Sequence, residues 1–199
     1  MQLAIIMTTV DGRVLRDHAR AVTALARELE VVEPALRTLP KLVARRPILT
    51  RIDLSRRIIG RFVHEAWRDE RWSGIRKIFG GVLGLGRDSA TAQRYARLAN
   101  FPRGSVGYEL HRYCEVNKFS LPGNQGAIPE RVLFHDVGRL LSGYGNEPSG
   151  EMKQAAFQAG FIRKDGFAFL FVGVIQFHLG IQCTPVAKPE VGLFDTICD

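Results

Sequence analysis

The chain has 199 residues and a formal net charge of +8. With 46% hydrophobic and 24% charged residues it has the composition of a globular protein, which excludes a disordered or fibrous one. The three cysteines, Cys114, Cys183 and Cys198, have no close spacing. This argues against a disulfide framework or a zinc ribbon, and it favours a reducing, cytoplasmic location.

The N-terminal residues 1–46 are predicted to form a helical arm. Residues 1–10 are apolar but lack the basic start and the cleavage site of a signal peptide. Residues 13–36 are rich in Ala, Leu, Arg and Glu, which favours a helix that Pro34 disturbs near its end. Pro40 and Pro47 mark further breaks. We expect residues 47–199 to form one helical domain, so the fold class is all-α with a single helical domain and an N-terminal helical arm.

Most of the positive charge lies in residues 41–77, which hold eleven basic and four acidic residues. Apolar residues recur there at helical spacing: Ile48, Ile52, Ile59, Phe62, Val63 and Trp67. Arginines fall between them: Arg51, Arg56, Arg57 and Arg61. The pattern predicts a basic amphipathic helix that lies on an anionic membrane surface, as in a peripheral membrane protein. A core-packed helix with a solvated basic face is the alternative.

The charge is not accompanied by a helix-turn-helix, zinc or RNA-binding aromatic signature, so we expect no nucleic-acid partner. Residues 80–86 form a glycine-rich segment that lacks the Lys-Ser/Thr ending of a P-loop. Asp88 is predicted to cap a helix that runs to Arg97, and residues 105–117 form another helical segment. Residues 122–126 are a turn cluster, and Pro129 is suited to a first helical position.

Polar residues with chemical potential gather between His135 and Glu151. His135 and Arg139 are four apart and share one helix face, with Asp136 one position round. Gly143, Gly145 and Pro148 stop that helix. Ser149 is then predicted to cap a new helix with Glu151 in its first turn. The short connection favours an antiparallel helical hairpin, so we expect these side chains to form a polar site between two helices.

This segment resembles the coenzyme-Q (ubiquinone) biosynthesis protein four family. That family carries His-Asp-x-x-His, eleven further residues and then Glu, which His135, Asp136 and Glu151 match at the same spacing. The Gly143-Tyr144-Gly145 and Gly150-Glu151 context is also typical of it. Upstream, Gly104-Ser105-Val106-Gly107 resembles the family's Gly-Ser/Thr-Leu-Gly segment. The resemblance covers about residues 94–161.

The resemblance implies a protein that holds an isoprenoid quinone precursor at a membrane and acts in replacing the carboxyl-bearing carbon of its ring. It implies catalytic roles for His135, Asp136 and Glu151. His111 and Glu109 lie on the preceding helical segment, and we expect them to line the same pocket. The expected partners are an isoprenoid or fatty-acyl lipid, an anionic membrane surface and a second copy of the chain in a homodimer.

One position departs from the family. Arg139 stands where the motif has its second histidine, and a guanidinium has no lone pair to give a metal. We therefore expect no metal and no other cofactor, with the charge of Arg139 acting on Asp136 and Glu151. Two alternatives stay open: a catalytically silent lipid-binding scaffold, and a His-Asp metal-dependent phosphohydrolase with His111 and Asp195 as further ligands.

The most apolar segment, residues 167–181, is too short to span a membrane and contains Gln176 and His178. It is predicted to be a buried helix, with His178 as a hydrogen-bonded core residue. Six phenylalanines near it are predicted to be mainly core, or else to wall an isoprenoid tunnel: Phe157, Phe161, Phe167, Phe169, Phe171 and Phe177.

Overall fold

The computed structural model describes residues 1–54, 56–57, 60, 88–127, 130, 133–162, 165–183 and 188–192. Within these ranges the regular structure is helical. The strand-type pairing found there is an isolated antiparallel bridge between Leu179 and Val191. The all-α fold class is therefore confirmed.

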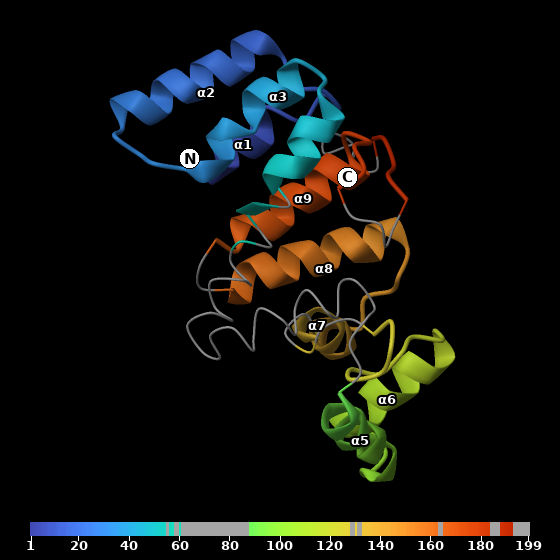
Figure 1. The fold of residues 1–199 in the computed structure, drawn as a ribbon. Coiled ribbons are helices and arrows are strands. Elements are labelled where there is room, and N and C mark those ends of the chain that lie inside the picture. Colours follow the sequence, from blue (N-terminus) through green and yellow to red (C-terminus); the bar gives the residue numbers. More distant parts are fainter. Residues whose placement is uncertain are drawn as a thin grey trace. The chain divides into compact units, whose positions relative to one another are not determined.

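Figure 1 shows the described elements in chain order. They are α1 (Gln2–Met7), α2 (Arg16–Glu28), η1 (Pro34–Arg37), α3 (Leu39–Val43), α5 (Ser89–Ala96), η2 (Arg97–Asn100), α6 (Val106–Val116), α7 (Phe134–Ser142), α8 (Pro148–Phe161) and α9 (Phe167–Phe177). Residues 47–54 are also helical. The helix expected over residues 13–36 is shorter than predicted. It ends where Glu30 takes a positive φ of 52°, and Pro34 starts a separate 3-10 turn.

The chain forms two compact units. The first joins Met1–Ile58 to Tyr144–Asp199, and the second is Ile59–Gly143. The first unit thus combines N-terminal and C-terminal segments of the sequence. The boundary expected between residues 46 and 47 stays a prediction.

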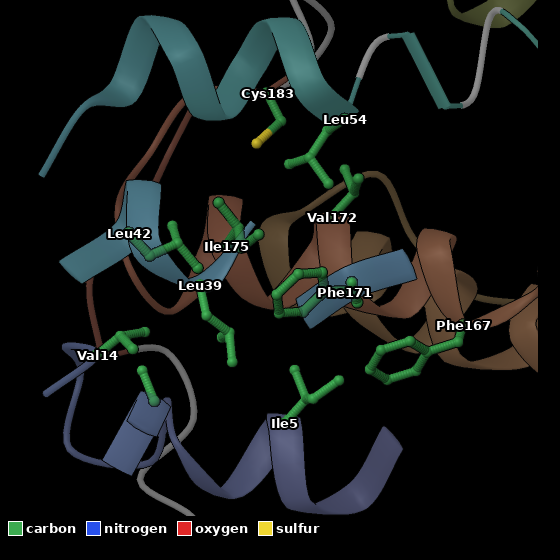
Figure 2. Close-up of a cluster of buried hydrophobic side chains, with 12 residues drawn as sticks. Ile5, Val14, Leu39, Leu42, Leu54, Phe167, Phe171, Val172, Ile175 and Cys183 are labelled. Carbon is green, nitrogen blue, oxygen red and sulfur yellow. The ribbon is translucent and has the colours of Figure 1, made fainter. Parts of the chain in front are cut away.

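Helix α9 supplies much of the core of the first unit. Its residues Phe171 and Ile175 have no exposed surface, and they pack with Ile5 of α1 and Leu39 of α3. Leu54 of the helix at residues 47–54 joins the same cluster, as Figure 2 shows. The prediction that residues 167–181 form a buried helix is therefore confirmed for α9.

Helix α8 packs along α9 (Figure 1). The two approach closely at Gly173, where an added Cβ would lie 2.8 Å from Sδ of Met152 and 3.1 Å from Cβ of Ala155. The expectation that Phe157 and Phe161 belong to the core is wrong, because they are 40% and 47% exposed. Helical geometry puts Phe157 on the side of α8 away from Ala155. Phe167, Phe171 and Phe177 are buried as predicted, and Phe169 is half-buried.

His178 is the hydrogen-bonded core histidine that the sequence predicts. It is 5% exposed, and its Nε2 lies 2.9 Å from the carbonyl oxygen of Thr9. Because a carbonyl can only accept, Nε2 donates in this bond. Gln176, also buried, accepts a hydrogen bond from the backbone N–H of Cys183 at 3.1 Å. The polar residues of this apolar segment thus tie α9 to chain segments at both ends of the sequence.

In the second unit the predicted helix starts are confirmed. The Asp88 carboxylate accepts from the N–H of Thr91 at 3.1 Å, and Ser105 caps α6 through the N–H of Tyr108 at 3.3 Å. The turn cluster is also confirmed: Gly123 has φ +91°, and its carbonyl accepts from the N–H of Asp88 at 2.9 Å. Leu110 and Cys114 of α6 then pack with Leu133, which precedes α7.

Three predicted features lie outside the described residues: the glycine-rich segment 80–86, residues 55, 58–59 and 61–77 of the basic stretch, and Pro129. In the described part of the chain, the helices are all too short or too polar to cross a membrane.

Candidate functional site

Helix α7 carries the first half of the predicted site. It ends at Gly143, as predicted, with φ +72° and an N–H that donates to the carbonyl of Arg139 at 2.8 Å. His135 and Arg139 share one face, as their spacing requires. Arg139 is 4% exposed, which is unusual for a charged side chain and costs free energy unless the guanidinium is well bonded.

The guanidinium of Arg139 contacts the imidazole of His135 directly. Its Nη2 lies 3.0 Å from Nε2 of His135. Arginine can only donate, so Nε2 of His135 accepts and the ring in this geometry carries its proton on Nδ1. The lone pair that a histidine offers to a metal is therefore used by Arg139.

Asp136 lies on a different side of α7, near α6. Burial raises the pKa of the Cys114 thiol to about 11, and the negative charge of Asp136 adds to this rise. The two helices pack together through Cys114 and Leu110 on α6 and through Val137 and Leu140 on α7. Asp136 therefore lies near enough to α6 for its charge to act on Cys114.

Glu109 and His111 have local partners on α6. Glu109 accepts from the N–H of Gly104 at 3.3 Å and pairs with Nε of Arg112 at 3.5 Å. Nδ1 of His111 lies 3.5 Å from a carboxylate oxygen of Glu115. These contacts follow the helix surface. That either residue lines a pocket together with His135 stays a prediction.

Glu151 lies in the first turn of α8, as predicted, but the cap of this helix differs. Ser149 is inside the helix, whose N-cap is Glu147 and whose first residue is Pro148. Proline suits this place because its fixed φ is already helical and the first position needs no N–H donor. Glu151 belongs to the first unit and His135 to the second. Their convergence stays a prediction.

Metal ligands do not gather among the residues that the structure describes: no three His, Cys, Asp or Glu side chains there lie close enough to hold an ion. Asp195, named above as a ligand for the phosphohydrolase alternative, lies outside these residues.

A second candidate site, which the sequence did not suggest, is a pocket of about 750 Å³ in the first unit. It is lined by residues 12–16 before and at the start of α2, by Leu42, Val43, Arg45 and Pro47 around the end of α3, and by residues 179–182 and Val191 after α9. Sequence signals for it are weak, because packing alone brings these distant segments together.

The pocket combines an apolar base with basic residues. Val14 and Leu42 are buried members of the main core (Figure 2). Arg13, Arg16 and Arg45 are exposed. Arg45 has φ +47° and follows α3 in a Schellman turn. The N–H of Arg45 donates to the carbonyl of Leu42, and the N–H of Arg46 donates to the carbonyl of Lys41, both at 3.0 Å. This turn fixes the backbone of Arg45 at the pocket.

The helix at residues 47–54 has one buried and one exposed apolar side. Thr50 and Leu54 are 0% and 2% exposed. Ile48, Leu49 and Ile52 are 72%, 42% and 49% exposed. Arg45, Arg46 and Arg51 are exposed beside them. We call Arg45, Arg46, Ile48, Leu49, Arg51 and Ile52 the basic apolar face.

Arg57 does not belong to a solvated basic surface, contrary to the expectation from the pattern. Its side chain is 14% exposed, and Nη2 donates to both carboxylate oxygens of Asp165 at 2.9 and 3.3 Å. The reason is tertiary: the loop before α9 brings an acid to this position. Of the described arginines of the pattern, Arg51 and Arg56 are exposed as expected, and Arg57 is not.

No protein-family model, curated protein or solved structure matches this chain. The resemblance to the coenzyme-Q biosynthesis protein four family therefore depends on the motif residues themselves.

Proposed function

We propose that this protein is a lipid-binding protein of the coenzyme-Q biosynthesis type, which holds an isoprenoid or fatty-acyl lipid while it lies on an anionic membrane surface. The observation that carries the proposal is the basic apolar face. Ile48, Leu49 and Ile52 expose aliphatic surface on one side of a helix whose other side is fixed in the core by Leu54.

Such a surface is stabilised by an apolar medium bordered by negative charge. Covering aliphatic area contributes about 25 cal/mol per Å². Each arginine near an anionic bilayer adds about 1 kcal/mol, and this term weakens as salt rises. Scattered exposed apolar residues are normal, but an apolar row beside arginines, as on the helix that begins at residue 47, is typical of interfacial helices.

The expected test is co-sedimentation with vesicles of phosphatidylcholine alone or mixed with phosphatidylserine. The protein should bind the mixed vesicles, less tightly at high salt. The double variant Ile48→Ser/Ile52→Ser should bind at least about tenfold more weakly, since two aliphatic side chains lose their contact. Val116→Ser on α6 is the matched control, because Val116 is 73% exposed, close to the 72% of Ile48.

Two results would contradict the proposal. One is wild-type protein that stays in the supernatant with phosphatidylserine vesicles at low salt. The other is a double variant that sediments as well as Val116→Ser. The proposal would be supported if Arg51→Glu weakens binding to the mixed vesicles and Val116→Ser does not.

The chemical part of the proposal is decarboxylation of the lipid head group: the bond from the ring to its carboxyl breaks, carbon dioxide leaves and a proton takes its place on the ring carbon, with His135, Asp136 and Glu151 as the acting residues. Its support is the motif resemblance. A carboxylated quinone-precursor analogue presented in vesicles is the appropriate substrate, and release of carbon dioxide that His135→Ala abolishes is the expected result. A protein that binds vesicles but releases none would be the silent scaffold. The homodimer expected from the sequence stays a prediction.

A further inference from the structure

The pocket beside α2 and α3 has the size and lining of a small-molecule site. Its volume of about 750 Å³ is within the usual range for ligand pockets, roughly 300–1,000 Å³. Val14 and Leu42 are 9% and 5% exposed and belong to the main hydrophobic core. Val43 and Ile181 are half-buried and pack against the same core. An apolar chain placed there would therefore continue the core.

The charged residues that line the pocket are all basic. Arg13, Arg16 and Arg45 line it, and its described lining includes no acidic residue. The acids next to lining residues in the chain are Asp11 and Glu190, both exposed, and Asp17, which is 3.9 Å from Arg20. Three guanidinium groups from two segments, next to an apolar base, complement a molecule with an apolar chain and an anionic head.

The pocket and the basic apolar face are formed in part by the same segment of the chain. Arg45 and Pro47 line the pocket, and Ile48 directly follows Pro47 on the exposed side of the helix. A protein lying on a membrane through Ile48 and Ile52 would therefore have its pocket beside that membrane.

We propose that this pocket binds one single-chain anionic lipid, with its chain against Val14 and Leu42 and its head group between Arg13, Arg16 and Arg45. The inference rests on the proposed function, because it names the site and the chemical class of the lipid. Two sources share this chemistry: a fatty acid with a carboxylate head, and a prenyl phosphate with a phosphate head.

The test measures binding of monomeric ligand in solution, without vesicles, by isothermal titration calorimetry. The probes are palmitate, farnesyl monophosphate and the uncharged hexadecanol, each below its aggregation limit. The pocket variant is Arg13→Ala/Arg16→Ala/Arg45→Ala. The matched control is Arg20→Ala/Arg27→Ala/Arg37→Ala, which removes the same charge at exposed positions outside the lining.

We expect palmitate or farnesyl monophosphate to bind the wild type and the control equally well. The pocket variant should bind about tenfold or more weakly, because charge-assisted hydrogen bonds to the head group are lost. The tighter of the two anionic probes identifies the source. Hexadecanol that binds as tightly as the better anion, or a pocket variant that matches the control, would overturn the inference.

The outcome separates this inference from the proposed function. Ile48→Ser/Ile52→Ser should keep the affinity for the anionic probe while losing vesicle binding. Val191→Trp changes a pocket residue that is 77% exposed. This variant should keep vesicle binding but lose affinity for the anionic probe, because the larger side chain fills the pocket. If the wild type binds vesicles but neither anionic probe, only the proposed lipid site in the pocket is contradicted. If the wild type binds a probe but no vesicles, only the proposed membrane binding is contradicted.

Discussion

The guanidinium of Arg139 donates a hydrogen bond to Nε2 of His135, 3.0 Å away on the same face of α7. In the motif that this segment resembles, position 139 is a second histidine and both rings are available to a metal. Arg139 itself offers no lone pair to a metal. It also occupies the Nε2 lone pair of His135, since arginine donates and cannot accept.

This pair should contribute measurably to stability. His135→Ala removes an acceptor from a guanidinium that is 4% exposed, which should lower the free energy of unfolding by about 1–3 kcal/mol. Arg139→Met should also be costly, and the two changes together should cost less than their sum. Urea unfolding of both single variants and the double variant measures this coupling. Leu141→Ala, at a position of α7 that is 65% exposed, is the control and should change little. Additive effects would show that the hydrogen bond contributes nothing.

Zinc binding should depend on residue 139. We expect the wild type to hold no stoichiometric zinc, because the Nε2 lone pair of His135 accepts from a cation. Arg139→His frees that lone pair and adds a second imidazole one turn away, so its zinc affinity should rise. Elemental analysis after dialysis against zinc compares the two proteins. The interpretation of Arg139 would be wrong if the wild type held one zinc ion per chain and His135→Ala lost it.

Cys114 should react slowly with alkylating agents, because the thiolate is the reactive form. Burial raises its pKa to about 11, and the charge of Asp136 contributes in the same direction. Asp136→Asn should therefore lower the pKa of Cys114 and speed its alkylation near pH 9. Peptide mass spectrometry follows each cysteine separately. The internal control is Cys183, whose pKa burial raises to about 12 and whose rate should not change. Equal Cys114 rates in both proteins would place Asp136 too far away to act.

Asp53 should make stability depend on acid pH. Partial burial alone would raise its pKa, but hydrogen bonds from Thr38 and Lys41 and the charges of Lys41 and Arg57 lower it below the ordinary value. The carboxylate oxygen lies 2.8 Å from Oγ1 of Thr38 and 3.0 Å from Nζ of Lys41.

Because the pKa of Asp53 is lower in the folded chain, its contribution is complete above the unfolded value of about 4 and is lost as pH falls through the folded value. Asp53→Asn should cost about 1 kcal/mol at pH 7 and progressively less below pH 4. Thermal unfolding from pH 3 to pH 7 gives both curves. Asp17→Asn, where the carboxylate is 92% exposed, should cost almost nothing. A difference between wild type and Asp53→Asn that does not shrink in acid would contradict this assignment.

Local structure was largely predictable from the sequence. The caps at Asp88 and Ser105, the stop at Gly143 and the turn at Gly123 depend on backbone groups within a few residues, so short segments specify them. The periodicity and apolar character of residues 167–181 likewise predicted a buried helix with an internal hydrogen-bonded His178. His135 and Arg139 had to share a face for the same reason.

Only tertiary structure decided which side of an amphipathic segment is covered. Arg57 and Arg51 are equivalent in a pattern of charges, yet Arg57 pairs with Asp165, more than a hundred positions away, while Arg51 is exposed. Phe157 is as apolar as Phe171, but α9 packs against the other side of α8, so Phe157 stays 40% exposed. The pocket has the same origin, because Val14, Leu42 and Ile181 meet only when α2, α3 and the chain after α9 pack around one core. Burial depends on contacts between distant segments, whereas a sequence pattern reports only the neighbours along the chain.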